Sequence, residues 1–116
     1  MPNVYVIQNH CSYDNRTGMM VPRYDLSPAE EFGKLVFLLS PITVPKNPAK
    51  VIAELRRKLW DFSDEDYLLM IGNPCFIAFA AAVAADINDG RISLLQFNGS
   101  QKKYFVVRAQ GLIDLE

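Results

Sequence analysis

The residues best suited to chemistry in this chain are its single histidine and two cysteines. His10 follows a short apolar run, and Cys75 stands in the first turn of an expected helix, where the helix dipole favours a thiolate. If the two side chains meet, His10 can act as the base for a Cys75 nucleophile. The alternative is an inert thiol, because the apolar Phe76 and Ile77 indicate burial of Cys75. We favour the inert thiol and expect no catalytic residue.

A second possible chemistry is anion binding at the carboxyl ends of parallel strands, where open α/β sheets bind their ligands. Free amides at the start of the helix after Asn73 would suit a phosphate group. The candidate ligand-binding residues are Asn9, His10, Ser40, Gly72, Asn73 and Cys75. In the alternative interpretation Asn73 only caps its helix, and Gly72-Asn73-Pro74 lacks the glycine-rich length of a P-loop.

Metal binding would have to use an acidic run. Its residues are Asp61, Asp64, Glu65 and Asp66. This run precedes a strand, so it falls at the edge of the sheet opposite the expected ligand crevice, where a solvated turn is the ordinary explanation. One histidine and two cysteines cannot by themselves supply a four-ligand zinc site. We expect neither a metal site nor any other cofactor.

Nucleic-acid binding would need a basic patch. The candidates are Arg56, Arg57 and Lys58 beside Trp60, and Lys102 and Lys103 beside Tyr104. Twelve basic and thirteen acidic residues give a net charge of −1, which lacks the electrostatic signature of a general nucleic-acid binder. Most such clusters are a solvated surface. Contact with RNA or DNA is therefore not expected.

Composition predicts one folded domain over residues 1–116. Half of the residues are hydrophobic and 22% are charged, which is typical of a globular chain. Two cysteines are too few for a secreted disulfide scaffold, and no signal sequence precedes the first expected strand. We therefore expect a protein of the cytoplasm.

The elements that position these residues are organised around residues 66–90. An apolar strand is expected at 66–72, and Asn73 and Pro74 begin an apolar helix over 74–88. Residues 67–87 are nearly long enough for a transmembrane helix. The Asn73-Pro74 pair near one end and the acidic flanks argue against it, so we expect no membrane contact.

The remaining patterns predict further strands at 3–8, 35–40 and 91–97, with a terminal hairpin whose second strand is 103–108. A capping box at Ser27-Pro28-Ala29-Glu30 predicts a short helix, and a longer amphipathic helix is expected at 48–60. Residues 11–25 read as a polar hairpin with its turn at 15–18. The predicted fold is a small three-layer α/β domain whose mostly parallel sheet ends in a C-terminal antiparallel strand. Strand order is left open.

A protein contact surface is expected on two features. The helix at 74–88 has a face of small side chains at Ala78, Ala81, Ala82 and Ala85. That face is covered either by a second copy of the chain or by the helix at 48–60. The edge strand 103–108 and exposed aromatics at Tyr13, Tyr24 and Tyr104 offer another contact. We expect a protein partner and a homo-oligomer.

Two segments carry a resemblance to a known group. They are YDLSPAEEFGKLVFLLSP and YLLMIGNPCFIAFAAAVAADINDGRISLLQF. With them the chain resembles short uncharacterised accessory proteins of tailed bacteriophages. The shared residues are caps, glycines and core, with no catalytic motif. The resemblance implies a non-catalytic accessory protein that acts in the host cytoplasm, binds a protein partner and self-associates. The alternative is a small nucleotide- or phosphate-binding protein, with or without hydrolysis, that uses the carboxyl edge of the sheet.

Overall fold

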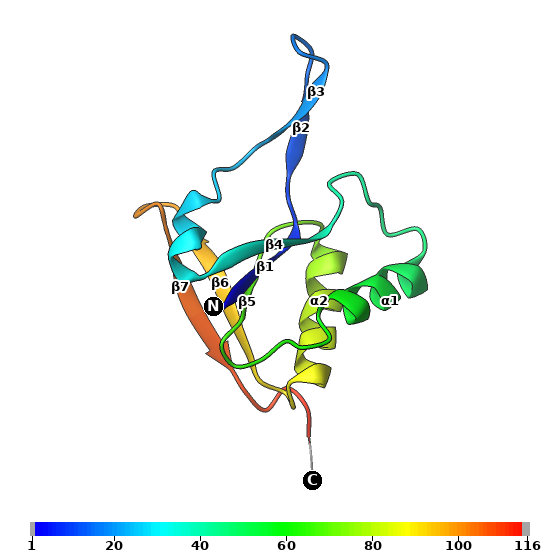
Figure 1. Ribbon diagram of the computed structural model, residues 1–116, viewed down its shortest axis with the longest axis vertical. Helices are drawn as coiled ribbons and strands as arrows, with labels where there is room; N and C mark the ends of the chain where they lie inside the picture. The colour runs from blue at the N-terminus through cyan, green and yellow to red at the C-terminus, as the bar shows by residue number, and fades with distance from the viewer. Residues whose placement is uncertain (1, 115–116) are drawn as a thin grey trace.

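The computed structural model describes residues 2–114, and its main element is a five-stranded sheet with the order β4-β1-β5-β6-β7. These strands are β1 (Asn3–Gln8), β4 (Lys34–Leu39), β5 (Tyr67–Leu69), β6 (Ile92–Asn98) and β7 (Lys103–Ala109). The pairings among β4, β1, β5 and β6 are parallel, and β7 runs antiparallel to β6. The structure confirms the small α/β domain with a mostly parallel sheet and a C-terminal antiparallel strand (Figure 1).

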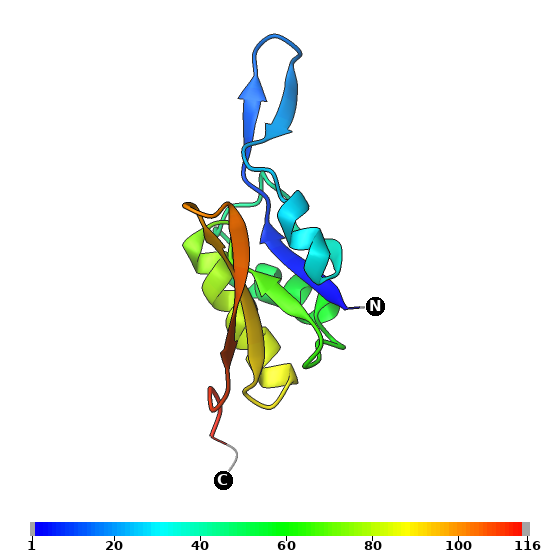
Figure 2. The same cartoon turned by 90° about the vertical axis from the view of Figure 1, so that its left-hand side faces the viewer.

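Two helices cover one face of this sheet, α1 (Pro48–Lys58) and α2 (Pro74–Ile87). Along β1 the side chains alternate: Tyr5 and Ile7 join the core under the helices, whereas Val4 and Val6 face the other side. There they pack with Ala29 of η1 (Ser27–Phe32), a 3-10 helix. The third layer is therefore thin, and Figure 2 shows η1 beside the sheet.

The helix caps agree with the sequence at α1 and α2 but not at η1. Asn47 and Asn73 accept hydrogen bonds from the N–H groups of Lys50 and Cys75, at 3.3 and 2.8 Å. The predicted capping box at Ser27 does not form, because the chain there makes a short 3-10 helix with no side-chain cap at its start. Instead the Asp25 carboxylate accepts from the Ser27 N–H at 3.0 Å.

Two strands differ from their predicted character. β4 lies at the edge of the sheet, so Phe37 is 50% exposed and the strand is only partly buried. β5 covers three residues rather than 66–72, because the Ile71 N–H donates back to the Leu69 carbonyl oxygen at 2.8 Å and interrupts the regular pairing. The Met70 N–H still donates to the Leu95 carbonyl oxygen at 3.1 Å, which ties the end of β5 to β6.

A separate two-stranded sheet projects from the domain. It consists of β2 (Cys11–Asp14) and β3 (Met19–Pro22), which pair antiparallel around a turn at residues 15–18. The structure confirms the hairpin and its turn. Figures 1 and 2 both show it extending away from the five-stranded sheet, and the molecule measures 56 × 36 × 24 Å along its principal axes. We call residues 11–22 the arm.

Over residues 2–114, α2 is the most apolar helix, yet neither it nor any other helix has the combined length and hydrophobicity needed to cross a bilayer.

Candidate functional site

The carboxyl ends of β4, β1 and β5 meet at the side chain of Gln8, which is 5% exposed. Its Nε2 donates to the carbonyl oxygens of Ser40 and Thr43, at 3.1 and 3.0 Å, and its Oε1 accepts from the Asn73 N–H at 3.0 Å. The strand order reverses here: β4 is added on one side of β1, and the next strand in the sheet, β5, is added on the other side. A doubly wound sheet binds ligands at this position, but Gln8 fills it with three hydrogen bonds.

Gly72 makes the close approach to Gln8 possible. Its φ is +127°, and a Cβ atom at this position would lie 2.7 Å from the Gln8 Cβ. Ser40, Gly72 and Asn73 are thus brought together as predicted, but they are held by Gln8, which the sequence did not single out. The N–H groups of Asn73 and Cys75 are both engaged within the chain and are not free for a phosphate group.

The other predicted ligand residues lie around this junction. The thiol-bearing Cys75 is exposed, so the expected burial of this side chain is wrong: α2 turns its first residues toward solvent. Asn9 Oδ1 is buried and has no hydrogen-bond partner among residues 2–114. The ring of His10 meets that of Tyr24 edge-on, with 5.8 Å between the ring centroids.

A cavity of about 640 Å³ opens beside the junction, at the base of the arm. Its floor is formed by the end of β5 and by Ile77 of α2, and its walls come from the segment before η1 and the β6–β7 hairpin. The lining residues are His10, Tyr24, Asp25, Pro28, Leu69, Met70, Ile71, Gly72, Ile77, Phe97, Gly99, Lys102 and Tyr104. Two of the predicted ligand residues, His10 and Gly72, therefore line one cavity.

The four alanines of the expected contact face of α2 differ in how far they are buried. Ala85 is buried, Ala81 is partly buried against the core, and Ala78 and Ala82 are exposed. α1 packs on a flank of α2, where Arg56 and Asp86 form an ion pair at 2.8 Å. Tyr104 is only 8% exposed, so its expected place at the surface is wrong: the β6–β7 register sets it opposite Phe97, with 5.2 Å between the ring centroids.

The structure also shows where the acidic run and the two basic clusters of the sequence lie. Asp66 is buried and accepts hydrogen bonds from the backbone N–H groups of Asn3 and Ser63. Within the described chain, no three or more His, Cys, Asp or Glu residues group together in a way that would hold a metal ion. The basic residues of α1 and those of the β6–β7 turn lie on opposite sides of the molecule in Figure 1, so they do not form one basic patch.

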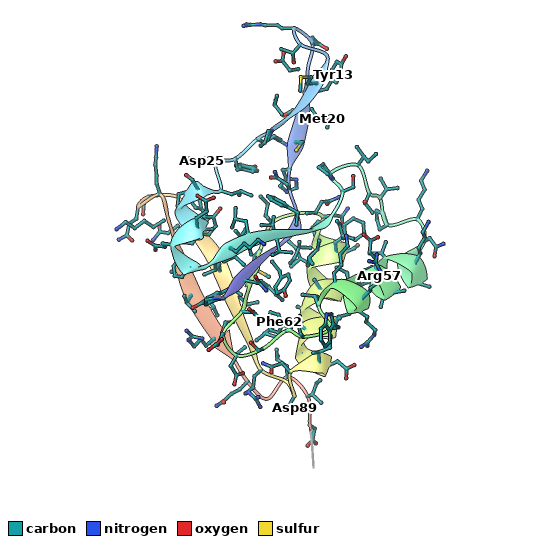
Figure 3. All side chains as sticks on the ribbon, viewed as in Figure 1. Tyr13, Met20, Asp25, Arg57, Phe62 and Asp89 are labelled. Carbon is teal, nitrogen blue, oxygen red and sulfur yellow. The ribbon has the colours of Figure 1, made fainter. Side chains whose placement is uncertain are left out.

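The arm sets Tyr13, one of the aromatics expected at a contact surface, beside exposed apolar residues that the sequence did not assign to a site. Its register pairs Tyr13 with Met20 and Cys11 with Pro22, which places these four residues on the same side of the two-stranded sheet. We call them the apolar arm face. Tyr13 is 61% exposed and Met20 is 46% exposed (Figure 3). The opposite face is mixed, with Ser12 and Asp14 next to Met19 and Val21. The consecutive apolar residues Met19, Met20 and Val21 were the signal in the sequence that could have indicated an apolar surface on the arm.

These features define a small α/β domain with a projecting hairpin. The Gln8 side chain fills the position where the strand order reverses. The family model of the phage Pam3 gp32-like proteins matches residues 2–110, so the chain belongs to this family. The match confirms the resemblance to accessory proteins of phages. Neither a curated protein nor a solved structure gives a significant match to the chain.

Proposed function

We propose that this phage protein is a non-catalytic binding module that contacts a protein partner through its arm and also self-associates. The observation that carries the proposal is the apolar arm face, which leaves Tyr13 and Met20 largely in solvent. The host cytoplasm is the proposed site of action, because the resemblance and the family are those of phage proteins.

The physical argument concerns the stability of a hairpin on its own. A two-stranded sheet is marginally stable in water, and strands of this kind need a covered face to remain folded. The four-residue strands of the arm have no third strand within residues 2–114, and none of the arm residues belongs to the hydrophobic core, so Tyr13 and Met20 remain exposed. Exposed aromatic and methionine side chains are enriched in protein interfaces. A protein partner would supply the missing cover.

Replacing both Tyr13 and Met20 with serine is expected to abolish partner binding and self-association while leaving the domain folded. The substitutions remove the two largest side chains of the apolar arm face, and the arm adds little to the core. Light scattering reports the mass of the purified chain, and affinity capture from infected bacteria reports the partner.

The matched control replaces Met19 and Val21, on the opposite face of the arm, with serine. These side chains are 62% and 39% exposed, so the control removes a similar apolar surface. Equal losses of binding in the two double variants would contradict a role specific to the apolar arm face.

A second candidate function is binding of a nucleotide or phosphate compound, and the cavity of about 640 Å³ favours it. Its volume lies in the range of small-molecule sites, and His10, Asp25 and Lys102 give it polar groups beside apolar walls. If a nucleotide binds there, a thermal-shift screen should show stabilisation that is lost in His10→Ala. A flat screen, or a shift unchanged in His10→Ala, would count against this second function.

A further inference from the structure

A second cavity, of about 380 Å³, opens where β6 begins and β7 ends. Figure 3 labels Asp89, two positions before Arg91, at the end of the molecule away from the arm. The polar and charged lining of the cavity includes Asp64, Asn88, Arg91, Ser93 and Arg108. Its volume falls in the range of small-molecule sites. None of these residues lines the cavity at the base of the arm, so the two cavities are separate.

Strand register brings the charged side chains of this cavity to one face of the sheet. Ser93 of β6 pairs with Arg108 of β7, so their side chains lie on the same side, and Arg91 stands two positions before Ser93. On this face the core cluster that contains Ala29 of η1 reaches Leu95 and Val106. The next positions along the same face are Ser93 and Arg108, which lie outside that cluster. The two arginines therefore occupy the end of the face beyond the apolar cover.

Arg108 is held in place by contacts that leave its charge unpaired. Its Nη1 donates to the Ser93 Oγ at 2.7 Å, and its guanidinium lies 5.8 Å from the centre of the Tyr67 ring. Ser93 is buried, and the Tyr67 ring meets the Phe32 ring edge-on. Within residues 2–114 Arg108 takes part in no salt bridge. Its guanidinium is thus fixed in position without a carboxylate partner.

Arg91 is held by an acid of the same cavity. Its Nε donates to the Asp64 Oδ1 at 3.0 Å, and the Asn88 Nδ2 donates to the same oxygen at 2.9 Å. Hydrogen bonds from Asn88 and Arg91, together with the charges of Arg91 and Arg108, hold the pKa of the Asp64 carboxyl below its ordinary value. Two guanidinium groups therefore stand near one carboxylate, and the charged lining residues sum to +1.

We propose that this cavity binds the phosphate group of a small phosphorylated compound, with Arg91 and Arg108 as its donors. A guanidinium has five N–H donors. Arg108 uses Nη1 on Ser93 and Arg91 uses Nε on Asp64, and their other N–H groups make no hydrogen bond within residues 2–114. A phosphate monoester offers three oxygens and a charge of about −1.5 to −2 at pH 7, so it can engage both guanidinium groups. A carboxylate, with two oxygens, is matched by one.

The rest of the cavity constrains the remainder of the ligand. The volume of about 380 Å³ exceeds that of a phosphate group alone, which leaves room for a small attached group. Asp64 lies beside Arg91 and would repel a second anionic group, so the attached part is expected to be neutral. The site lies at the amino ends of β5 and β6, whereas the cavity at the base of the arm adjoins their carboxyl ends.

A titration of the isotope-labelled chain with inorganic phosphate, followed by NMR at constant ionic strength, tests the site. The amides of residues 91–93 and 108–110 should shift and saturate together, while those of α1 stay unchanged. Arg108→Gln removes one guanidinium and should weaken binding about tenfold. Arg91→Gln leaves the contact of Arg108 with Ser93 intact and should weaken binding by a similar factor. Acetate, as the carboxylate probe, should bind about tenfold more weakly than phosphate.

Two controls separate a specific site from general charge. Arg57→Gln removes an exposed positive charge on α1 and should leave phosphate binding unchanged. Arg108→Lys keeps the charge but loses the planar fork, so its affinity should lie between those of the unaltered chain and Arg108→Gln. Circular dichroism melting shows whether each variant is folded.

Three outcomes would overturn the inference. They are phosphate shifts that grow without saturation, equal weakening in Arg57→Gln and Arg108→Gln, and acetate binding as tight as that of phosphate. Saturating shifts at His10, Gly72 and Gly99 in place of residues 91–93 would also overturn it. That last result would instead place the anion at the base of the arm, in support of the second candidate function.

Discussion

Replacing Gln8 with leucine is expected to lower the free energy of unfolding by about 3 to 5 kcal/mol. Leucine keeps much of the side-chain volume but makes none of the three hydrogen bonds to Ser40, Thr43 and Asn73. The Thr43 carbonyl oxygen after β4 and the Asn73 N–H after β5 would then lack this partner, whereas the Ser40 carbonyl oxygen still accepts from the Thr43 N–H. Each buried polar group left unpaired costs about 1 to 3 kcal/mol. Urea unfolding followed by circular dichroism measures the change.

The control for this variant is Gln96→Leu. Gln96 also lies in a strand, β6, but its side chain is exposed, so the expected change is within about 0.5 kcal/mol. A similar loss in the two variants would mean that Gln8 does not join the three strand ends.

Replacing Gly33 with alanine is expected to cost about 2 to 4 kcal/mol. Gly33 ends η1 with φ of +156° and ψ of −171°, a conformation that essentially only glycine adopts. A Cβ atom there would lie 2.3 Å from the Pro2 carbonyl oxygen, which is itself the acceptor for the Lys34 N–H. The methyl group would force apart the start of β1 and the start of β4. Thermal and urea unfolding both report this loss.

Gly99→Ala is the matched control for the glycine variant. Gly99 lies in the β6–β7 turn, has no atom within 4 Å of a built Cβ and has no positive φ that would strain a side chain. Alanine should change stability there by less than about 0.5 kcal/mol. If Gly33→Ala unfolds at the same urea concentration as Gly99→Ala, the contact between η1 and the N-terminal segment is not rigid.

Local signals explain why the helices could be predicted from the sequence. Asn47-Pro48 and Asn73-Pro74 each combine a side-chain acceptor with a residue that needs no donor, and both pairs begin a helix as expected. Gly90 adopts φ of +82° just after α2, a left-handed conformation that suits a glycine following the end of a helix. These features depend on neighbours in the chain, and the sequence shows such neighbours directly.

Tertiary pairing explains what the sequence left open. The order β4-β1-β5-β6-β7 makes β4 an edge strand, although its apolar run is typical of a buried one. Nothing in the sequence near Gln8 indicates that its side chain reaches residues 40, 43 and 73, because those partners are more than thirty positions away. The prediction therefore placed the ligand residues at the correct carboxyl edge of the sheet, but it missed Gln8, whose side chain fills that edge.

The arm shows why the position of the contact surface was also difficult to predict from the sequence. The turn at residues 15–18 could be predicted from Asp14, Asn15 and Gly18, and the strand register follows from it. That the hairpin stands away from the domain could not be predicted, because it depends on contacts the arm does not make with the core. The contact surface was sought on α2, on strand 103–108 and at three tyrosines, of which Tyr13 and Tyr24 are exposed and Tyr104 is buried. The exposed Met19 and Met20 of the arm were not included in that expectation.

Hydrogen exchange of the arm amides, measured at low and high protein concentration, tests the central claim most directly. If a second copy covers the apolar arm face, the amides of β2 and β3 should exchange more slowly at high concentration, while those of β1 and β5 stay unchanged. In the Tyr13 and Met20 double variant the arm should exchange rapidly at both concentrations. Equal arm exchange at both concentrations in the unaltered chain, together with a mass of 13.1 kDa throughout, would contradict the account.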